Sequence, residues 1–369
     1  MKPSQVIESC IRSISNDRNR NTLILGQPGI GKTSIAKLVA QKMHRKIITT
    51  TPAVSDPTDA KGLGFPSPDG THAIFLPLGQ MYELINAVEP VLWFIDDLGQ
   101  ANNSVQASLM PWLLERRCGQ HKLPDCVSII AASNERGHKG GVSGLLEPVK
   151  SRFHKIITME ADYKEWRSNY AIPNNVPMDM LAFLDFHGHR AENKMFNNFV
   201  PSNDMKNSPI PRTWANAADL INDYFEDYQT TANDFGTEFD DVNSILFEDV
   251  SGAVGQASAA SLWGFRKIRS QLTHSIDYIL ENPGTAFIPQ SVDAQFAVIN
   301  ALSSSATVDN FGSILKYGER LYNAIPKEIA VSLMNDSVLK NPDLKETNIF
   351  VKIVTSTVFA SSFDGSRSG

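Results

Sequence analysis

The chain has 369 residues, of which 42% are hydrophobic, so it can bury a large core, and this length is typical of two or three domains. A formal net charge of −6 argues against a basic surface over the whole chain, as many nucleic-acid-binding proteins have, and leaves only a local basic patch open. Three cysteines, with no C-x-x-C pair, predict neither a disulfide framework nor a zinc site. The N-terminus lacks a signal-peptide core, and no apolar run is long enough to span a membrane, so we expect a cytoplasmic protein.

The first 160 residues alternate between strand and helix patterns, which is typical of an α/β fold with a parallel sheet. One helix is defined especially well, because Val105, Leu109, Trp112 and Leu113 share a face and Asn102 or Asn103 can cap it. The five expected strands lie near 22–26, 47–52, 91–96, 127–132 and 155–159, and the helices near 3–15, 32–43, 79–88, 103–117 and 144–152.

The most informative motif is GQPGIGKT at 26–33, which matches the phosphate-binding pattern G-x-x-x-x-G-K-[ST] directly after the first strand. Its glycines allow successive backbone N–H groups to converge on phosphate oxygens. We expect Lys32 to reach the β- and γ-phosphates and Thr33 to bind Mg²⁺. The expected nucleotide-binding residues are Gly26, Gln27, Pro28, Gly29, Ile30, Gly31, Lys32, Thr33 and Ser34. The alternative is a structural turn that binds no nucleotide.

Two carboxylates follow the third strand, in VLWFIDDLGQA at 91–101. A strand buried on both faces presents acids only at its carboxyl end, where open α/β sheets bind ligands. We therefore expect Asp96 to join the Mg²⁺ shell and Asp97 to orient or deprotonate the attacking water. In the alternative interpretation, the pair caps the following helix.

Two more polar residues fall at positions where they can complete such a site. Asn134 ends the fourth strand and can bind the γ-phosphate or the water, although asparagine there is also a common turn former. Arg152 ends the helix before the last strand, where it can face a neighbouring molecule or form a surface salt bridge.

The ordered set GQPGIGKT, WFIDD, AASN and SRF, followed by SPIPRTWANAADL at 208–220, resembles AAA+ ATPases of the MoxR type. The resemblance covers about 1–230 and includes 56–65, followed by the hairpin-like stretch 66–77, which form an insertion that projects toward the central pore in that family. The runs at 104–117 and 314–329 are also similar to MoxR-like ATPases carried by bacteriophages, which would place the protein in the host cytoplasm.

The resemblance implies roles for single residues. Asn134 matches sensor 1, Arg152 the arginine finger that reaches the next subunit's nucleotide, and Arg212 the sensor 2 arginine on the lid. A finger that acts between subunits implies a homo-oligomeric ring, usually a hexamer, with ATP and Mg²⁺ at each shared site. For Arg212 the alternative is a helix N-terminal charge. The family usually has glutamate where this chain has Asp97, which shortens the reach of the base.

The expected domains are an AAA+ core at 1–160, a helical lid at 161–232 and an all-helical region at 233–369, whose tail at 360–369 we expect to be frayed. The resemblance implies an ATPase that remodels a partner protein, commonly one with a von Willebrand factor A domain. Two alternatives are a nucleic-acid motor or helicase loader, and a weakly hydrolysing scaffold gated by nucleotide. The motor is disfavoured because 56–77 contains Lys61 and His72 against three aspartates, Asp56, Asp59 and Asp69.

Overall fold

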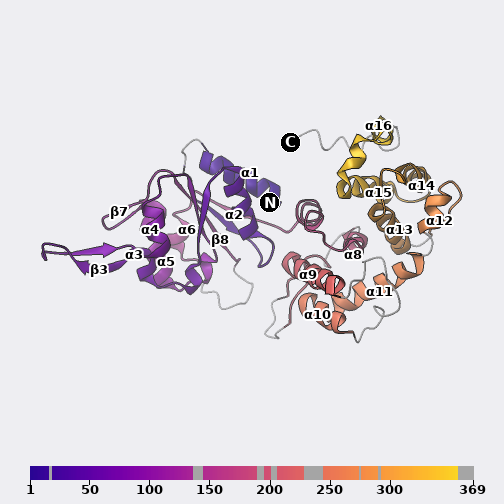
Figure 1. Ribbon diagram of the computed structural model, residues 1–369. Coiled ribbons are helices and arrows are strands. Elements are labelled where there is room, and N and C mark those ends of the chain that lie inside the picture. The colour runs from indigo at the N-terminus through magenta and orange to yellow at the C-terminus, as the bar shows by residue number, and fades with distance from the viewer. Residues whose placement is uncertain are drawn as a thin grey trace. The chain divides into compact units, whose positions relative to one another are not determined.

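The computed structural model describes residues 1–15, 19–135, 144–188, 195–200, 206–227, 244–273, 276–289 and 292–355 (Figure 1). They form two compact units, one built from Met1–Glu165 with residues 199–200 and the other from Trp166–Asn198 and the described chain from Lys206 onward. None of the helices in these ranges is long and apolar enough to cross a bilayer. The predicted frayed tail at 360–369 lies outside the described residues.

The first unit contains the predicted five-stranded parallel sheet, in the order β2-β5-β8-β1-β9. Because every neighbouring pair is parallel, all five carboxyl ends lie along one edge, where such sheets bind ligands. Each predicted strand is present within two residues of its expected bounds. The observed strands are β1 (Thr22–Leu25), β2 (Lys46–Thr50), β5 (Val91–Ile95), β8 (Val127–Ser133) and β9 (Lys155–Thr158).

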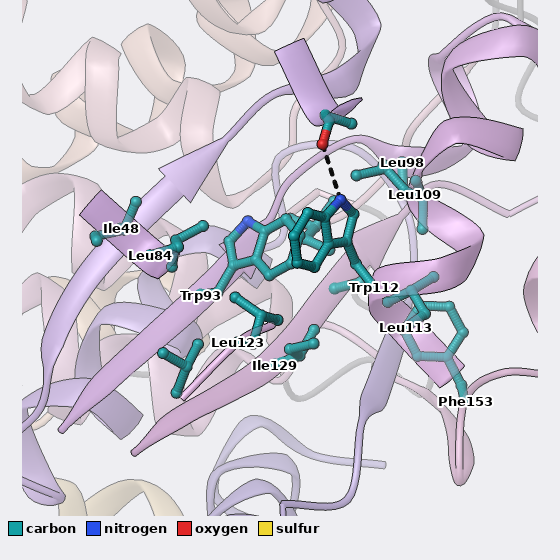
Figure 2. Packing of buried hydrophobic residues seen from close by; sticks show 14 of the residues in the cluster. Ile48, Leu84, Trp93, Leu98, Leu109, Trp112, Leu113, Leu123, Ile129 and Phe153 are labelled. Atoms are coloured by element: carbon teal, nitrogen blue, oxygen red, sulfur yellow. Dashed lines mark hydrogen bonds between the residues drawn. The ribbon is translucent and has the colours of Figure 1, made fainter. Parts of the chain in front are cut away.

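Helices cover both faces of the sheet, and every residue of β5 and β8 is buried. On one face, Phe94 and Ile130 pack with side chains of α1 (Pro3–Ile14) and α2 (Lys32–Lys42). On the other, Trp93 and Ile129 pack with side chains of α4 (Gly79–Ile85) and α5 (Asn103–Leu114), as Figure 2 shows. Neighbouring residues of a strand point to opposite faces, so these continuous apolar runs supply both cores.

Helix α5 has the predicted apolar face, and Asn102 is its cap, because the Asn102 side chain accepts a hydrogen bond of 3.0 Å from Val105 N. The prediction that it runs to 117 is wrong, since α5 ends at Leu114. Arg116 has a φ of 54°, which a helix does not allow, and it opens a short hairpin of β6 (Arg117–Cys118) and β7 (His121–Lys122). The Arg116 guanidinium donates to Pro124 O and Val127 O and so fixes the base of this hairpin.

The helix predicted at 144–152 is also shorter, because α6 comprises only Glu147–Lys150. Its start is set by Leu146, whose N–H donates 3.0 Å to the Gln106 side chain, and by the proline that follows Glu147. The predicted helix at 79–88 likewise ends early, as α4. The hairpin expected at 66–77 is present but starts earlier, because it pairs β3 (Leu63–Pro66) with β4 (Ala73–Leu76), after the short helix α3 (Pro57–Lys61).

The described part of the second unit is helical. Helix α8 (Met178–Gly188) packs against α11 (Gln256–Thr273) and α13 (Val292–Ser304), and α13 packs against α15 (Lys327–Lys340). The remaining elements are the turn at Arg167–Ala171, α9 (Pro211–Asp227), α10 (Ile245–Val254), α12 (Ile276–Glu281), α14 (Phe311–Ala324), the 3₁₀ turn at Pro342–Glu346 and α16 (Asn348–Thr355). Helix α7 (Tyr163–Trp166) lies where the chain passes from one unit to the other.

Candidate nucleotide-binding site

Sheet register brings the three predicted motifs of the first unit to one place. Leu25 of β1 pairs with Ser133 of β8, and Ile95 of β5 pairs with Ala131 of the same strand. The residues that follow these strand ends are Gly26, Asn134 and Asp96, and they are therefore neighbours at the carboxyl edge of the sheet. Residues more than 100 positions apart in the chain thus meet because three parallel strands are adjacent.

The loop between β1 and α2 has the conformation that its glycines predict. Gly31 has a φ of 101°, in the region that favours glycine, and it directly precedes the first residue of α2. A Cβ on Gly26 would lie 2.8 Å from the backbone oxygen of Met159, so the loop packs tightly against the end of β9. The loop ends at the N-terminus of α2, where backbone N–H groups and the helix dipole favour an anion.

Lys32 is buried, with 6% of its surface exposed, and its ammonium joins the loop to the sheet. Nζ donates to Gly26 O at 2.9 Å, to Gln27 O at 2.8 Å and to Asn134 Oδ1 at 2.7 Å. Because the Asn134 oxygen accepts from Lys32, the Nδ2 group of Asn134 is the part of this amide that can donate to another group. The hydrogen bond between them therefore fixes the position of the Lys32 ammonium and the orientation of the Asn134 amide at the carboxyl edge of the sheet.

Thr33 and Asp96 form the second contact between motifs, since Thr33 Oγ1 donates 2.7 Å to Asp96 Oδ2. Two oxygen ligands of Mg²⁺ at about 2.1 Å and at right angles lie about 3 Å apart, so this pair fits a magnesium ion. Among the described residues, no group of three or more His, Cys, Asp or Glu side chains can hold a metal.

Asp97 lies next to this pair in a left-handed conformation, with a φ of 52°. Its N–H donates 3.0 Å to Asp96 Oδ1, and its own Oδ1 accepts 3.0 Å from Gln100 Nε2. The side chain makes no capping hydrogen bond to the 3₁₀ turn Leu98–Gln100 that follows. The alternative of a helix-capping role for Asp97 therefore has no support in the geometry, whereas Gln100 holds the carboxylate in a defined orientation.

The two predicted arginines are carried by other elements than the glycine loop and the strand ends. Arg152 follows α6, its Nη1 donates to Pro148 O, and it makes no hydrogen bond to the glycine loop, Asp96 or Asn134 as these residues are described. Arg212 is exposed in the first turn of α9, in the second unit. The structure thus assembles the loop, Asp96, Asp97 and Asn134, and the roles of the arginines toward a nucleotide stay predictions.

The sequence analysis missed Gln106, which is fully buried and bonded to three backbone groups. A signal was present, because Gln106 lies three and seven residues before Leu109 and Leu113, on the apolar stripe of α5. A polar side chain on such a stripe needs partners in the core.

A separate pocket of about 320 Å³ opens beside the end of β2, and none of the loop residues lines it. Its lining includes the apolar side chains of Met81 and Trp93 and the carboxylates of Asp56 and Asp59. A backbone hydrogen bond from Thr58, followed by one from the Thr58 hydroxyl, lowers the pKa of Asp56. These carboxylates cap α3, which accounts for their arrangement.

Comparison with known proteins agrees with this geometry. Residues 21–153 match the family model of the AAA domain (dynein-related subfamily). The first unit carries an AAA domain. The matched range of the AAA domain contains the glycine loop, Asp96, Asp97, Asn134 and Arg152, whereas Arg212 lies beyond it.

Matches to individual proteins are short or distant. The Holliday junction branch migration complex subunit RuvB of Prochlorococcus marinus (strain MIT 9312) is 50% identical over 44 residues, which is 12% of this chain and 12% of that protein. The solved RuvB Holliday junction branch migration motor of Thermotoga maritima is 14% identical at a TM-score of 0.36, covering 87% of this chain and 86% of that one. A solved mutant of the same RuvB gives a TM-score of 0.38 at 14% identity, again covering 87% of this chain and 86% of that one.

Proposed function

We propose that the protein is a ring-forming AAA+ ATPase of the MoxR type that hydrolyses ATP to remodel a partner protein. The observation that carries the proposal is the convergence of two contacts at one sheet edge, Lys32 with Asn134 and Thr33 with Asp96. The match of residues 21–153 to the AAA domain supports the nucleotide-binding part.

Each residue of the site has a defined task in this proposal. A bound ATP with its Mg²⁺ would supply the reacting phosphate and neutralise the charge that develops on it. The loop N–H groups and Lys32 bind the phosphates, and Thr33 and Asp96 hold the cation. Asn134 donates from Nδ2 toward the γ-phosphate or the water. Asp97, held by Gln100, orients the water and accepts its proton.

The site is completed by a second protomer in this proposal. Within the described residues, Arg152 makes its hydrogen bond to Pro148 O of α6 and none to the site of its own chain, which suits an arginine that acts on a neighbour. Arg212 is assigned to the lid as sensor 2, where it would contact the nucleotide bound by its own protomer. A finger in trans implies a closed homo-oligomer, for which a hexamer is the expected size.

The partner is proposed to be a protein, of the class with a von Willebrand factor A domain. The β3–β4 hairpin exposes apolar side chains, with Leu63, Phe65 and Leu76 each between 42% and 46% exposed, and these can contact a protein. The β6–β7 hairpin lies against it, because Gln120 Nε2 donates 2.6 Å to Phe75 O.

A nucleic-acid motor is the second candidate, favoured by the short match to RuvB. The exposed Arg117 and Lys122 of the β6–β7 hairpin add positive charge that the insertion alone lacks. Against it stand Asp56, Asp59 and Asp69 on the adjoining segment and the net charge of −6. A scaffold that binds ATP but hydrolyses it slowly is a third candidate, which rests on the short side chain of Asp97.

One set of assays separates these candidates. ATP turnover and assembly state are measured for the wild type, Lys32→Ala, Asp97→Asn and Asp97→Glu, with and without double-stranded DNA at two salt concentrations. A protein remodeller hydrolyses ATP without DNA stimulation and loses turnover in Lys32→Ala and Asp97→Asn. DNA stimulation of about tenfold or more that falls steeply with salt supports the motor instead. Assembly without turnover in the wild type, with turnover gained in Asp97→Glu, supports the scaffold and contradicts the proposal.

A further inference from the structure

Gln106 on α5 joins two segments that are far apart in the sequence. Its Nε2 donates 3.0 Å to Ala101 O and 3.0 Å to Gly144 O, and its Oε1 accepts 3.0 Å from Leu146 N. The side chain is fully buried. The amide orientation follows from these partners, since two carbonyl oxygens require the NH₂ group and a backbone N–H requires the oxygen.

The two segments belong to the two halves of the proposed shared site. Ala101 follows the 3₁₀ turn Leu98–Gln100, and Gln100 Nε2 in that turn holds Asp97 Oδ1 at 3.0 Å. Leu146 directly precedes α6, and Pro148 O, at the second residue of α6, accepts the hydrogen bond from Arg152. Gln106 therefore bonds the segment before α6, which leads to the finger, to the backbone of Ala101, and its printed hydrogen bonds do not include Gln100 or Asp97 themselves.

Loss of the Gln106 amide would remove a partner from three backbone groups. The oxygens of Ala101 and Gly144 lie in buried hydrogen bonds and the N–H of Leu146 in a part-buried one, and an unpaired buried group is costly. Helix α6 has only four residues, so its position depends on its anchors rather than on its own helical stability. Loss of the amide should shift α6, and a displacement of about 1 Å in a catalytic group can reduce turnover by about 100-fold.

We propose that Gln106 is a positioning residue, which holds the segment of Arg152 in place so that the finger is presented correctly to the neighbouring protomer. This inference rests on the proposed function, because it requires a finger that acts in trans. It differs from a merely structural role in one respect. A structural defect impairs every task of the protomer, whereas a misplaced finger impairs only the site of its neighbour.

Complementation between inactive variants measures this difference. Asp97→Asn keeps its finger but lacks a working site, and Arg152→Ala keeps its site but lacks a finger. Each alone should be inactive, and the mixture should recover turnover at the interfaces where an intact finger meets an intact site. Gln106→Leu is then added to one parent at a time, which places the change either on the protomer that supplies the finger or on the protomer that supplies the site.

We expect Gln106→Leu in the Asp97→Asn parent to reduce recovered turnover about tenfold or more, and in the Arg152→Ala parent by about twofold or less. Gln106→Glu, which keeps the volume but replaces the NH₂ donor by oxygen, should behave the same way and serves if the leucine variant folds poorly. Ser108→Ala is the matched control, because it removes a buried hydrogen bond of 2.7 Å to Val105 O within α5 and should leave recovery unchanged in either parent.

The outcomes separate the two proposals. If the unmodified parents fail to complement although both bind nucleotide and assemble, the trans-finger model falls and the inference about Gln106 falls with it. If they complement and Gln106→Leu is harmless in both parents, or equally harmful in both, the positioning role alone is overturned. Thermal midpoints and assembly states of all variants establish that the comparison concerns folded rings.

Discussion

At the scale of single residues, two glycines of the phosphate loop are required for different reasons. We expect Gly31→Ala to destabilise the first unit by roughly 1–3 kcal/mol, because its φ of 101° strains any residue with a side chain. Gly26→Ala should cost more, since its Cβ would lie 2.8 Å from Met159 O, whose residue is hydrogen bonded to the end of β1. Urea unfolding checks both. Gly70→Ala is the control, because Gly70 has a φ of 70° and no atom within 4 Å of an added Cβ. It therefore measures the cost of backbone strain without a steric clash.

A second residue-scale prediction concerns Asp336 on α15. Its carboxylate lies 2.7 Å from Arg167 Nη2, and Arg167 also pairs with Asp185 of α8 at 3.1 Å. Burial raises the pKa of Asp336 to about 6, and the Asp185 carboxylate that shares the arginine adds to this rise, which Arg167 opposes. The folded state therefore binds more protons than the unfolded state between the ordinary pKa and about 6.

Stability contributed by Asp336 is consequently present at low pH and is lost as the pH rises through about 6. Compared with Asp336→Asn at each pH, the wild type should lose on the order of 2 kcal/mol of relative stability between pH 4.5 and pH 7.5. Amide hydrogen exchange of α8 and α15, compared between the two proteins at the same pH, measures this. A difference that stays constant with pH, or that grows in favour of the wild type at high pH, would contradict the assignment.

At the scale of elements, the β3–β4 hairpin depends on the glycine before it. A Cβ on Gly62 would lie 2.4 Å from Leu76 O, and Gly62 has a φ of 87°. We expect Gly62→Ala to separate the ends of the hairpin and to speed amide exchange at 63–76 about tenfold or more, with ATP affinity unchanged because the change lies outside the glycine loop. Exchange mass spectrometry and nucleotide titration check the two parts. Loss of ATP binding in this variant would show that the hairpin and the phosphate loop are coupled.

The elements that the sequence predicts well are those whose causes are local. The apolar runs of β5 and β8 and the stripe of α5 were sufficient to place the sheet and its main helix, and the glycine loop was predicted by its motif. The β6–β7 hairpin was missed because it depends on Arg116, whose left-handed backbone is fixed by hydrogen bonds to Pro124 O and Val127 O. The late start and short length of α6 depend on Gln106, 40 residues away from Leu146, which no local pattern shows.

In the candidate site, too, the residues with a local sequence motif were predictable and those that depend on distant contacts were not. Lys32, Thr33, Asp96 and Asn134 were predicted individually from motifs, and the parallel sheet then brings them together as adjacent strands require. The partners that hold them, Gln100 for Asp97 and Gln106 for the finger segment, are glutamines in ordinary-looking helical and turn sequence. Such supporting residues have no motif of their own, because their role comes from contacts that form only in the folded chain.

At the scale of the whole molecule, the proposal makes activity a property of the assembly. If Arg152 completes the site of a neighbour, turnover per protomer should rise with protein concentration and reach a plateau when rings form. Dilution below the assembly range should lower it even at saturating ATP. Turnover measured at several protein concentrations, with sedimentation velocity on the same samples, checks whether activity rises together with ring assembly.

Arg152→Ala provides the decisive comparison at this scale. Fingers typically contribute about 10³–10⁵ to turnover, so the variant should lose nearly all activity while it binds ATP with an affinity within a few-fold of the wild type. Lys32→Ala is the contrasting control, because it should lose the stabilisation that ATP confers, about 2.7 kcal/mol at a ligand concentration 100 times Kd. If Arg152→Ala instead loses binding as Lys32→Ala does, Arg152 belongs to the pocket of its own protomer. The requirement for a ring would then have to rest on some other residue.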